Sequence, residues 1–294
     1  MYYLNGKYVK EEDAKISILD LSILRGFGVF DYLRTYGGRP FHLWDHLLRF
    51  KYSAEEIGLV LPKTLPEIQE IIHTVQKLNH LVEASIKILL TGGISSDQFT
   101  PDPQGNLIVF AYPLSSYPQE FFTKGIKVIT TRLTRSLPKS KTTQYTPAIV
   151  AMQHGKAVDA QEVLYMNSRN EILEATTSNF FAFKNEILYT CRSDDVLIGI
   201  TREVVIKLCA PHFPIKLQAL HYEEIKEMQE AFITASNKEI MPVVQIDNCL
   251  IADGRVGTRT QRIMEIFRAY TQSSDWPALN IPRYQSSSSR QVFP

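Results

Sequence analysis

The chain has 294 residues, of which 44% are hydrophobic and 21% charged, enough for two modest domains or one large one. The formal net charge is +1, so the composition indicates neither a nucleic-acid partner nor an acidic-membrane partner. The three cysteines have no paired spacing, the first residues lack the apolar core of a secretion signal, and no apolar run approaches the roughly 20 residues of a membrane helix. We therefore expect a globular cytoplasmic protein with free thiols.

The N-terminal part, residues 1–112, mixes strand and helix patterns and is predicted to be an α/β domain. The helix predicted at 65–78 has a candidate cap residue, Thr64, and Pro66 in its first turn. The predicted elements are a hairpin around Asn5-Gly6, an extended pair around Gly37-Gly38, helices at 44–57 and 65–78, and buried strands at 84–90 and 106–111. Residues 113–125 change in character and are predicted to be an interdomain linker.

The C-terminal part, residues 126–271, also mixes strands and helices and is predicted to be a second domain. The predicted elements are a strand at 126–131, an extended segment at 137–145, a helix at 148–158, hairpins at 163–173 and 180–189, and helices at 202–210, 222–228 and 258–271. The remaining residues, 272–294, are rich in Pro and Ser and are predicted to be an irregular tail.

The central stretch, residues 137–179, places a lysine and a glutamate at predicted strand ends, separated by one helix and one hairpin. Lys141 lies in the Thr-rich extended segment, and Glu174 ends the second arm of the hairpin. A pyridoxal phosphate enzyme needs such a pair: the amine forms a Schiff base with the aldehyde, and the carboxylate keeps the pyridine nitrogen protonated. Other interpretations stay open. Lys141 can be an exposed edge lysine, Glu174 can simply close the hairpin, and Lys139 is a rival because two residues along a strand return to the same face.

Three residues offer donors for a phosphate group. Thr201 opens a predicted helix, Ser236 follows an apolar strand, and Arg49 on the first helix has a guanidinium that can bind two phosphate oxygens. Each alone is more often structural, as a cap or as part of a solvated helix face. Only their joint occurrence favours a phosphate site.

The remaining motifs carry little signal. His42 and His46 have the i,i+4 spacing of a metal-binding pair, but the glutamate of a zinc-protease motif is missing, so we interpret the pair as structural and expect no metal. Asp45 is interpreted as a residue of the first helical turn. The sequence contains no glycine-rich dinucleotide or nucleotide motif and no hydrolase elbow.

Six groups of residues occur in an order and at a spacing that are specific when taken together. They are Gly28-Val29-Phe30-Asp31 with Arg34; His46 with Arg49; Lys141 with Tyr145; Glu174 with Thr177-Ser178-Asn179; Leu197 with Gly199-Ile200-Thr201-Arg202; and Ser236 with Glu239-Ile240 and Pro242. In these groups the chain resembles the class IV aminotransferases, the pyridoxal phosphate enzymes of fold type IV. The resemblance extends from Leu4 to about Tyr270. It implies an N-terminal α/β domain, a short linker, a C-terminal domain built on a pseudo-barrel, and a homodimer.

The resemblance also implies a role for each matching residue. Lys141 matches the Schiff-base lysine, which later acts as general base at the substrate α-carbon; its preference over Lys139 rests on the spacing to Tyr145. Tyr145 is implied to contact the ring O3′ oxygen, and Glu174 to pair with the pyridine nitrogen. The implied phosphate residues are Arg49, Ile200, Thr201 and Ser236, and Leu197 is implied to pack on one face of the ring.

The chain departs from the family pattern at residues that bear on the substrate. Asp31 stands where many members have Glu, Gln144 where many have Asn, and Met241 interrupts the usual Glu-Ile-Thr-Pro. Phe30 replaces the tyrosine of the best-known D-amino acid enzymes. The chain also has two cations, Arg25 and Lys87, near positions that line the substrate side in relatives. We expect Arg25, with Lys87 or Arg34, to bind the substrate α-carboxylate. Alternatively, Arg25 is a surface or dimer-contact residue.

We therefore predict a pyridoxal phosphate-dependent aminotransferase that moves an amino group between an amino acid, with a D-amino acid favoured, and a 2-oxo acid. Family members with the same cofactor residues provide two alternatives, a branched-chain L-amino acid aminotransferase and a 4-amino-4-deoxychorismate lyase. A scaffold that binds the cofactor without turnover is a further alternative, which the presence of both Lys141 and Glu174 disfavours.

Overall fold

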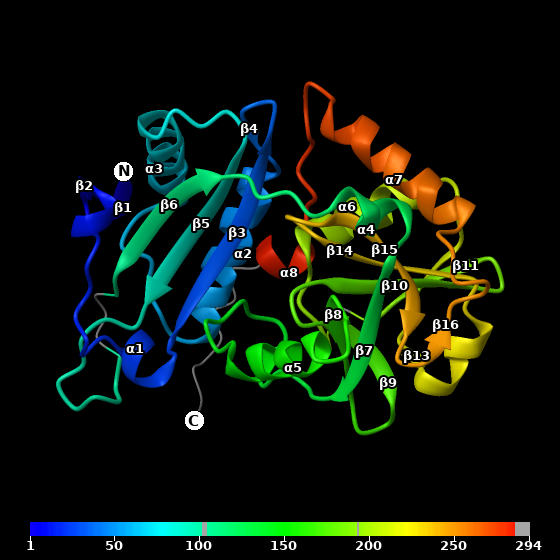
Figure 1. Cartoon of the computed structure of the whole chain (residues 1–294). Helices are drawn as coiled ribbons and strands as arrows, with labels where there is room; N and C mark the ends of the chain where they lie inside the picture. Colours follow the sequence, from blue (N-terminus) through cyan, green and yellow to red (C-terminus); the bar gives the residue numbers. More distant parts are fainter. Residues whose placement is uncertain (102–104, 193, 286–294) are drawn as a thin grey trace. The chain divides into compact units, whose positions relative to one another are not determined.

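A computed structural model describes residues 1–101, 105–192 and 194–285 (Figure 1). The chain packs as two compact units. Unit 1 comprises Met1–Ser115, Ser140–Gln144 and the described part of 274–294, and unit 2 comprises Ser116–Lys139 and Tyr145–Ser273. Both units mix helices and strands, which confirms the expected two-domain α+β fold. The predicted boundaries, with domains at 1–112 and 126–271, a linker at 113–125 and a tail at 272–294, stay a prediction. Residues 286–294 of the predicted tail lie outside the described residues.

Unit 1 contains a six-stranded antiparallel sheet with the order β2-β1-β6-β5-β3-β4. The strands are β1 (Tyr2–Leu4), β2 (Lys7–Val9), β3 (Gly28–Tyr36), β4 (Arg39–Pro40), β5 (Ala84–Thr91) and β6 (Leu107–Pro113). Along β3 the side chains alternate: Val29, Asp31 and Leu33 are buried, whereas Phe30 and Tyr32 on the opposite face are half-buried. This alternation is expected for a strand whose two faces have different surroundings.

Two helices, α2 (Leu43–Glu56) and α3 (Leu65–Leu78), cover one face of this sheet (Figure 1). Their apolar stripes, including Leu47, Phe50 and Ile68, form one core with the buried strand residues. The capping box of α3 joins Thr64 and Glu67, as the predicted cap requires. The unit also contains the 3-10 helix η1 (Glu11–Asp13) and the short helices α1 (Leu21–Arg25) and α8 (Pro282–Gln285), of which α8 lies in the predicted tail.

Unit 2 contains a ten-stranded sheet that closes on itself. The strands are β7 (Ile126–Arg132), β8 (Glu162–Met166), β9 (Glu171–Ala175), β10 (Asn179–Lys184), β11 (Ile187–Thr190), β12 (Ile215–Leu217), β13 (Leu220–His221), β14 (Glu230–Ala235), β15 (Glu239–Ile246) and β16 (Cys249–Leu250). The path β10-β14-β15-β7-β8-β9 returns to β10 through the pairing of Asn179 with Glu174. Apolar residues such as Val128, Ile233 and Val243 form the core of this unit. A closed ring of strands agrees with the expected pseudo-barrel.

The helices of unit 2 are α4 (Gln119–Thr123), α5 (Thr146–Lys156), α6 (Ile200–Cys209), the 3-10 helix η2 (Tyr222–Glu227) and α7 (Thr258–Thr271). The predicted helices at 148–158, 202–210 and 258–271 are confirmed, and the one at 222–228 is a 3-10 helix. Within the predicted linker, α4 forms a short helix. Over the parts of the chain that the structure covers, no helix is both long and apolar enough to span a bilayer.

The segment before α5 differs from the prediction. Residues 137–145 form turns and a single bridge, between Thr142 and Val29, in place of an extended segment that ends as a strand. Pro138 contributes to the difference because it has no N–H for a strand ladder. The argument that Lys139 and Lys141 share one face of a strand therefore does not apply.

Candidate active site

The predicted site residues fall into two groups, one in each unit, and each group is described by itself. Unit 1 holds the candidate base, one candidate phosphate residue and the candidate substrate residues: Lys141, Arg49, Arg25, Phe30, Arg34 and Lys87. Unit 2 holds the remaining candidate cofactor residues: Tyr145, Glu174, Leu197, Ile200, Thr201 and Ser236.

Lys141 is fixed through its backbone to two elements of unit 1. Its N–H donates to Ser53 Oγ of α2 at 3.1 Å, and its carbonyl accepts from Phe30 N–H of β3 at 3.0 Å. The Nζ atom lies 4.6 Å from the centre of the Phe30 ring, within the range of a cation–π contact. The rival Lys139 belongs to unit 2 and lies 3.1 Å from the exposed carboxylate of Asp194. The two lysines therefore have different surroundings, and Lys141 has those of a positioned amine.

A second lysine approaches the same aromatic ring. Lys87 Nζ on β5 lies 5.0 Å from the centre of the Phe30 ring, so the structure brings Phe30, Lys87 and Lys141 together. Burial lowers the pKa of Lys87 from its ordinary value. Arg34 instead packs its guanidinium over Tyr36, 4.1 Å from the ring centre, and Arg25 is exposed at the end of α1.

Arg49 is buried and held by a carboxylate. Asp31 Oδ2 lies 2.9 Å from Arg49 Nε and Oδ1 lies 2.8 Å from Arg49 NH2, and His46 Nδ1 lies 2.7 Å from the same Oδ1. Burial alone would raise the pKa of Asp31, but Arg49 and His46 hold it well below its usual range. The carboxylate is therefore charged and orients one edge of the guanidinium. His42 Nδ1 lies 2.9 Å from Asp45 Oδ2, so each histidine of the pair contacts its own buried carboxylate, as a structural role requires.

Glu174 lies in a buried polar cluster of unit 2. One carboxylate oxygen accepts from the backbone N–H of Leu197 at 3.2 Å and from Asn179 Nδ2 at 3.4 Å, and the other lies 3.5 Å from Arg135 NH1. Asn179 Nδ2 also donates to the Leu197 carbonyl at 2.8 Å. No role was predicted for Arg135, and its sequence position carries no signal of this contact.

The N-terminus of α6 follows directly from this cluster. A Cβ atom on Gly199 would lie 2.1 Å from Asn179 Oδ1, so only glycine permits the approach of this backbone to Asn179. No side chain caps α6, and its first residues, Ile200 and Thr201, are buried. The first N–H groups of a ten-residue helix with this end can bind an anion. Ser236, in the turn between β14 and β15, is half-buried, and α6 packs against β14.

These residues of unit 2 fit the two ends of pyridoxal phosphate. A carboxylate suits the pyridine nitrogen, and an uncapped helix N-terminus whose second residue, Thr201, carries a hydroxyl suits a phosphate. Among the residues that the structure describes, no cluster of three His, Cys, Asp or Glu side chains could hold a metal.

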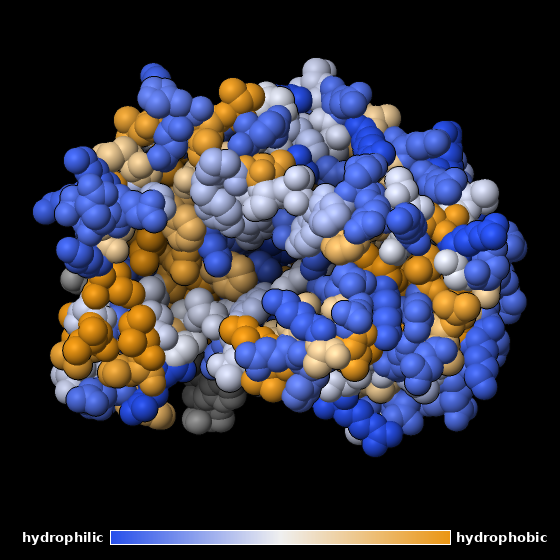
Figure 2. Space-filling view, in the orientation of Figure 1, coloured by the Kyte–Doolittle hydropathy of each residue, from blue (hydrophilic) through white to orange (hydrophobic). Residues whose placement is uncertain are grey.

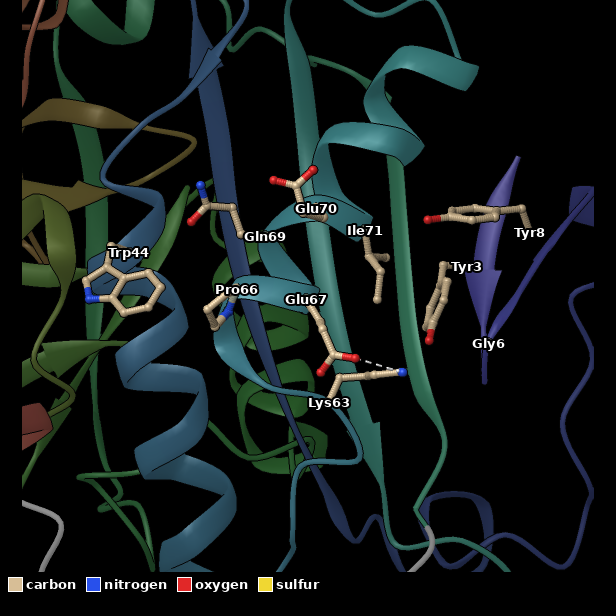
Figure 3. Close-up of a pocket in the computed structure, with 10 residues that line it drawn as sticks. All are labelled: Tyr3, Gly6, Tyr8, Trp44, Lys63, Pro66, Glu67, Gln69, Glu70 and Ile71. Carbon is tan, nitrogen blue, oxygen red and sulfur yellow. Dashed lines mark hydrogen bonds and ion pairs between the residues drawn. The ribbon is translucent and has the colours of Figure 1, made fainter.

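A groove of about 570 Å³ on unit 1 is lined by none of the predicted site residues (Figure 3). Its walls come from α3, α2 and the β1–β2 hairpin, and they include the aromatic rings of Tyr3, Tyr8 and Trp44. The ion pair between Lys63 and Glu67, 3.0 Å long, lies at its edge. The groove is therefore separate from the residue groups above.

Comparisons with known proteins agree with the resemblance in the sequence. The model of the amino-transferase class IV family matches residues 28–246. A D-alanine aminotransferase of Staphylococcus epidermidis is 32% identical over 277 residues, which cover 92% of this chain and 98% of the relative. Among solved structures, the branched-chain amino acid aminotransferase of Escherichia coli has a TM-score of 0.85, 26% identity, and coverage of 94% of this chain and 96% of its own. The branched-chain aminotransferase of Thermoproteus uzoniensis with norvaline has a TM-score of 0.82, 28% identity, and coverage of 92% and 94%. A further branched-chain amino acid aminotransferase, solved with pyridoxamine 5′-phosphate, has a TM-score of 0.86, 25% identity, and coverage of 92% and 93%.

Proposed function

The chain belongs to the amino-transferase class IV family, and we propose that its preferred amino donor is a D-amino acid. It is a pyridoxal phosphate-dependent aminotransferase, which moves an amino group between an amino acid and a 2-oxo acid. The observation that carries the proposed preference is the 32% identity to a D-alanine aminotransferase along 98% of that relative's length. The second candidate is a branched-chain L-amino acid, which the similarity to branched-chain enzymes at TM-scores of 0.86, 0.85 and 0.82 supports.

The proposed chemistry assigns a task to each candidate residue. When bound, pyridoxal phosphate supplies an aldehyde that carries the amino group and a ring that accepts electrons. Lys141 Nζ would act as the general base that moves a proton from the substrate α-carbon to the cofactor in one half-reaction and back from the cofactor to the α-carbon of the product in the other. Glu174 holds a proton at the pyridine nitrogen, because a buried carboxylate favours the positive charge there. Arg49, the first amides of α6 at Ile200 and Thr201, and the Ser236 hydroxyl would hold the phosphate, Tyr145 would contact the ring O3′ oxygen, and Leu197 would pack on the ring.

The proposed carboxylate-binding residues are Lys87 and Arg25, with Arg34 as an alternative to Lys87. Lys87 is supported most directly, because its Nζ lies 5.0 Å from the Phe30 ring over which Lys141 also lies, at 4.6 Å. A cation at this place can bind the substrate α-carboxylate while the ring restricts the space for the side chain. The positions of the bound substrate carboxylate and of the base Lys141 relative to the substrate α-carbon would determine which stereoisomer is accepted.

We also propose that the protein is a homodimer. Unit 1 exposes the apolar residues Ile18, Leu19, Ile23, Ile94 and Phe99, and the backbone bridge between Asp20 and Ile94 places the first three beside Ile94. Hydrophobic residues are visible at the surface of this unit in Figure 2. Ile18 is 79% exposed and Phe99 is 78% exposed, and contiguous apolar surface of this kind is typical of protein interfaces. Light scattering after gel filtration tests the proposal: twice the chain mass supports it, and the mass of one chain contradicts it.

The proposed location is the cytoplasm. Cys191, Cys209 and Cys249 are free thiols, which is usual for proteins of a reducing compartment. Fractionation of cells that express the full chain tests this proposal, because recovery in a secreted or membrane fraction would contradict it.

The visible spectrum of the purified holoenzyme tests the proposed donor. D-alanine, D-glutamate and L-leucine are added separately, and the absorption band of the bound cofactor is followed. Loss of the band with a D-amino acid supports the proposal, and loss only with L-leucine favours the branched-chain candidate. A band that no amino acid changes, together with release of pyruvate from aminodeoxychorismate, would indicate the lyase.

A further inference from the structure

A buried ion pair in unit 2 lies outside the residues assigned so far. Lys238, in the turn between β14 and β15, is 5% exposed, and its Nζ lies 2.6 Å from Glu162 Oε2 at the start of β8. The same Nζ donates to Thr177 Oγ1 at 2.6 Å and to Ser178 Oγ at 3.0 Å. An ammonium group has three N–H donors, so each donor of Lys238 has a partner.

The carboxylate of the pair is equally well bound. Glu162 is 1% exposed and accepts hydrogen bonds from the hydroxyls of Thr176 and Thr177 as well as from Lys238. Burial alone would raise the pKa of Glu162, but Lys238 and the two hydroxyls hold it below its usual value. A buried ion pair loses its hydration on both sides, and apolar replacements are often as stable, so stability alone is a weak explanation for this pair.

The pair connects two turns that lie beside the proposed cofactor residues. The first turn joins β9 to β10: Ala175 N–H donates to the Ser178 carbonyl at 2.7 Å, and Glu174 and Asn179 flank the turn. The second turn contains Ser236 and closes with Lys238 N–H, which donates to the Ala235 carbonyl at 3.1 Å. The side chain of Lys238 therefore reaches from the turn that carries Ser236 to the turn that follows Glu174.

We propose that Lys238 is a positioning residue of the cofactor site: with Glu162 it holds the turn after Glu174 against the turn that carries Ser236. The inference rests on the proposed roles of Glu174 and Ser236. Because one residue binds the pyridine nitrogen and the other the phosphate, the ion pair fixes the separation of the groups that bind the two ends of the cofactor. A site that is held in its binding geometry loses less conformational freedom when the ligand binds.

The test measures the dissociation constant of pyridoxal phosphate by titration of the apoprotein, together with the melting temperature of the apoprotein and the absorption maximum of the holoenzyme. The variants are Lys238→Met and the double variant Glu162→Gln/Lys238→Met. We expect both to bind the cofactor about tenfold more weakly, with a shifted absorption maximum, in line with the loss on removing residues that orient the direct ligands of a site. The double variant leaves no unpaired buried charge, so its melting temperature should stay near that of the unaltered chain and it decides the test if Lys238→Met does not fold.

Lys184→Met is the matched control. Lys184 Nζ lies 2.5 Å from Glu224 and 2.7 Å from Glu227, at the end of β10 opposite Asn179, so its loss should leave the affinity and the absorption maximum unchanged. A double variant with unaltered affinity and spectrum would overturn the inference, as would an equal loss of affinity in Lys184→Met. Failure of the unaltered chain to bind the cofactor would overturn the proposed site as well, so the two failures are distinguishable.

Discussion

The Asp31 carboxylate and the Arg49 guanidinium meet edge to edge, with Oδ2 2.9 Å from Nε and Oδ1 2.8 Å from NH2. Both side chains are buried, and two parallel bonds fix the plane of the guanidinium as well as its position. Asp31 lies on β3 next to Phe30, whose ring contacts Lys141. One strand of unit 1 therefore orients the proposed phosphate residue from one face and lies beside the proposed base on the other.

Replacement of the aspartate should be costly because it leaves a buried guanidinium without its counter-charge. We expect Asp31→Asn to lower the free energy of unfolding of the apoprotein by about 3–5 kcal/mol, the usual cost of breaking a buried ion pair from one side. Urea denaturation measures the change. Glu70→Gln, at an exposed residue of α3, is the control and should have little effect. An Asp31→Asn protein as stable as the unaltered chain would contradict the buried pair.

The same pair predicts a pH dependence of stability. The folded-state pKa of Asp31 is held well below its usual range, whereas the pKa of an unfolded aspartate is about 3.9. The unfolded chain therefore takes up the proton first as the pH falls, so the contribution of Asp31 is fully present above about pH 4 and decreases below it. The stability difference between the unaltered chain and Asp31→Asn should accordingly be constant from about pH 7 to 5 and shrink below about pH 4. A difference that stays constant at acid pH would contradict the lowered pKa.

Local features of this protein can be predicted from its sequence, whereas its long-range contacts cannot. The helices at 65–78 and 258–271 follow from apolar spacing and, for the first, a cap residue, because these signals lie within a few residues of each other. The choice of Lys141 as the candidate base also rests on nearby residues, but through the family resemblance of its spacing to Tyr145. In contrast, the contacts of Arg135 with Glu174 and of Lys238 with Glu162 depend on which strands pair and in what register, and no local pattern of the chain encodes that. The wrong prediction for 137–145 arose because a Thr-rich composition resembles a strand, whereas turns around Pro138 prevent one.

The choice between the two neighbouring lysines can be tested directly. We expect Lys141→Ala to lower kcat by about 10²- to 10⁴-fold, the usual contribution of a general base, and to abolish the covalent link to pyridoxal phosphate, which mass spectrometry after borohydride reduction detects. Lys139→Ala is the control, because Lys139 pairs with the exposed Asp194 and should keep both the activity and the link. A modified Lys139 in the unaltered chain would reverse the assignment.

Glu174 should affect the rate of the chemical step more than the binding of the substrate. Glu174→Gln keeps the shape of the side chain but removes the charge that holds a proton at the pyridine nitrogen, so we expect kcat to fall by about a hundredfold or more and the absorption maximum of the holoenzyme to shift. Glu171→Gln, three residues earlier on β9, is the control because Glu171 pairs with the exposed Arg169. Normal kcat in Glu174→Gln would contradict the proposed partner of the pyridine nitrogen.

The proposed carboxylate residues can be separated from the cofactor residues by their kinetic effect. Lys87→Met removes a cation near Phe30, and a hydrogen bond to a charged group contributes about 1.5–3 kcal/mol, so KM for the amino donor should rise about 10- to 100-fold. Arg25→Ala should raise KM in the same way if the exposed end of α1 contributes to the site, and kcat should change little in either variant because the base and the cofactor residues are intact. Lys77→Met, at an exposed residue of α3, controls for the loss of one positive charge.

Measurement with D-alanine and L-leucine in parallel distinguishes the two proposed donors, because the residue that binds the carboxylate should matter most for the preferred one. An unchanged KM in Lys87→Met with a raised KM in Arg25→Ala would assign the carboxylate to α1, and an unchanged KM in both would leave Arg34 as the cation to replace next.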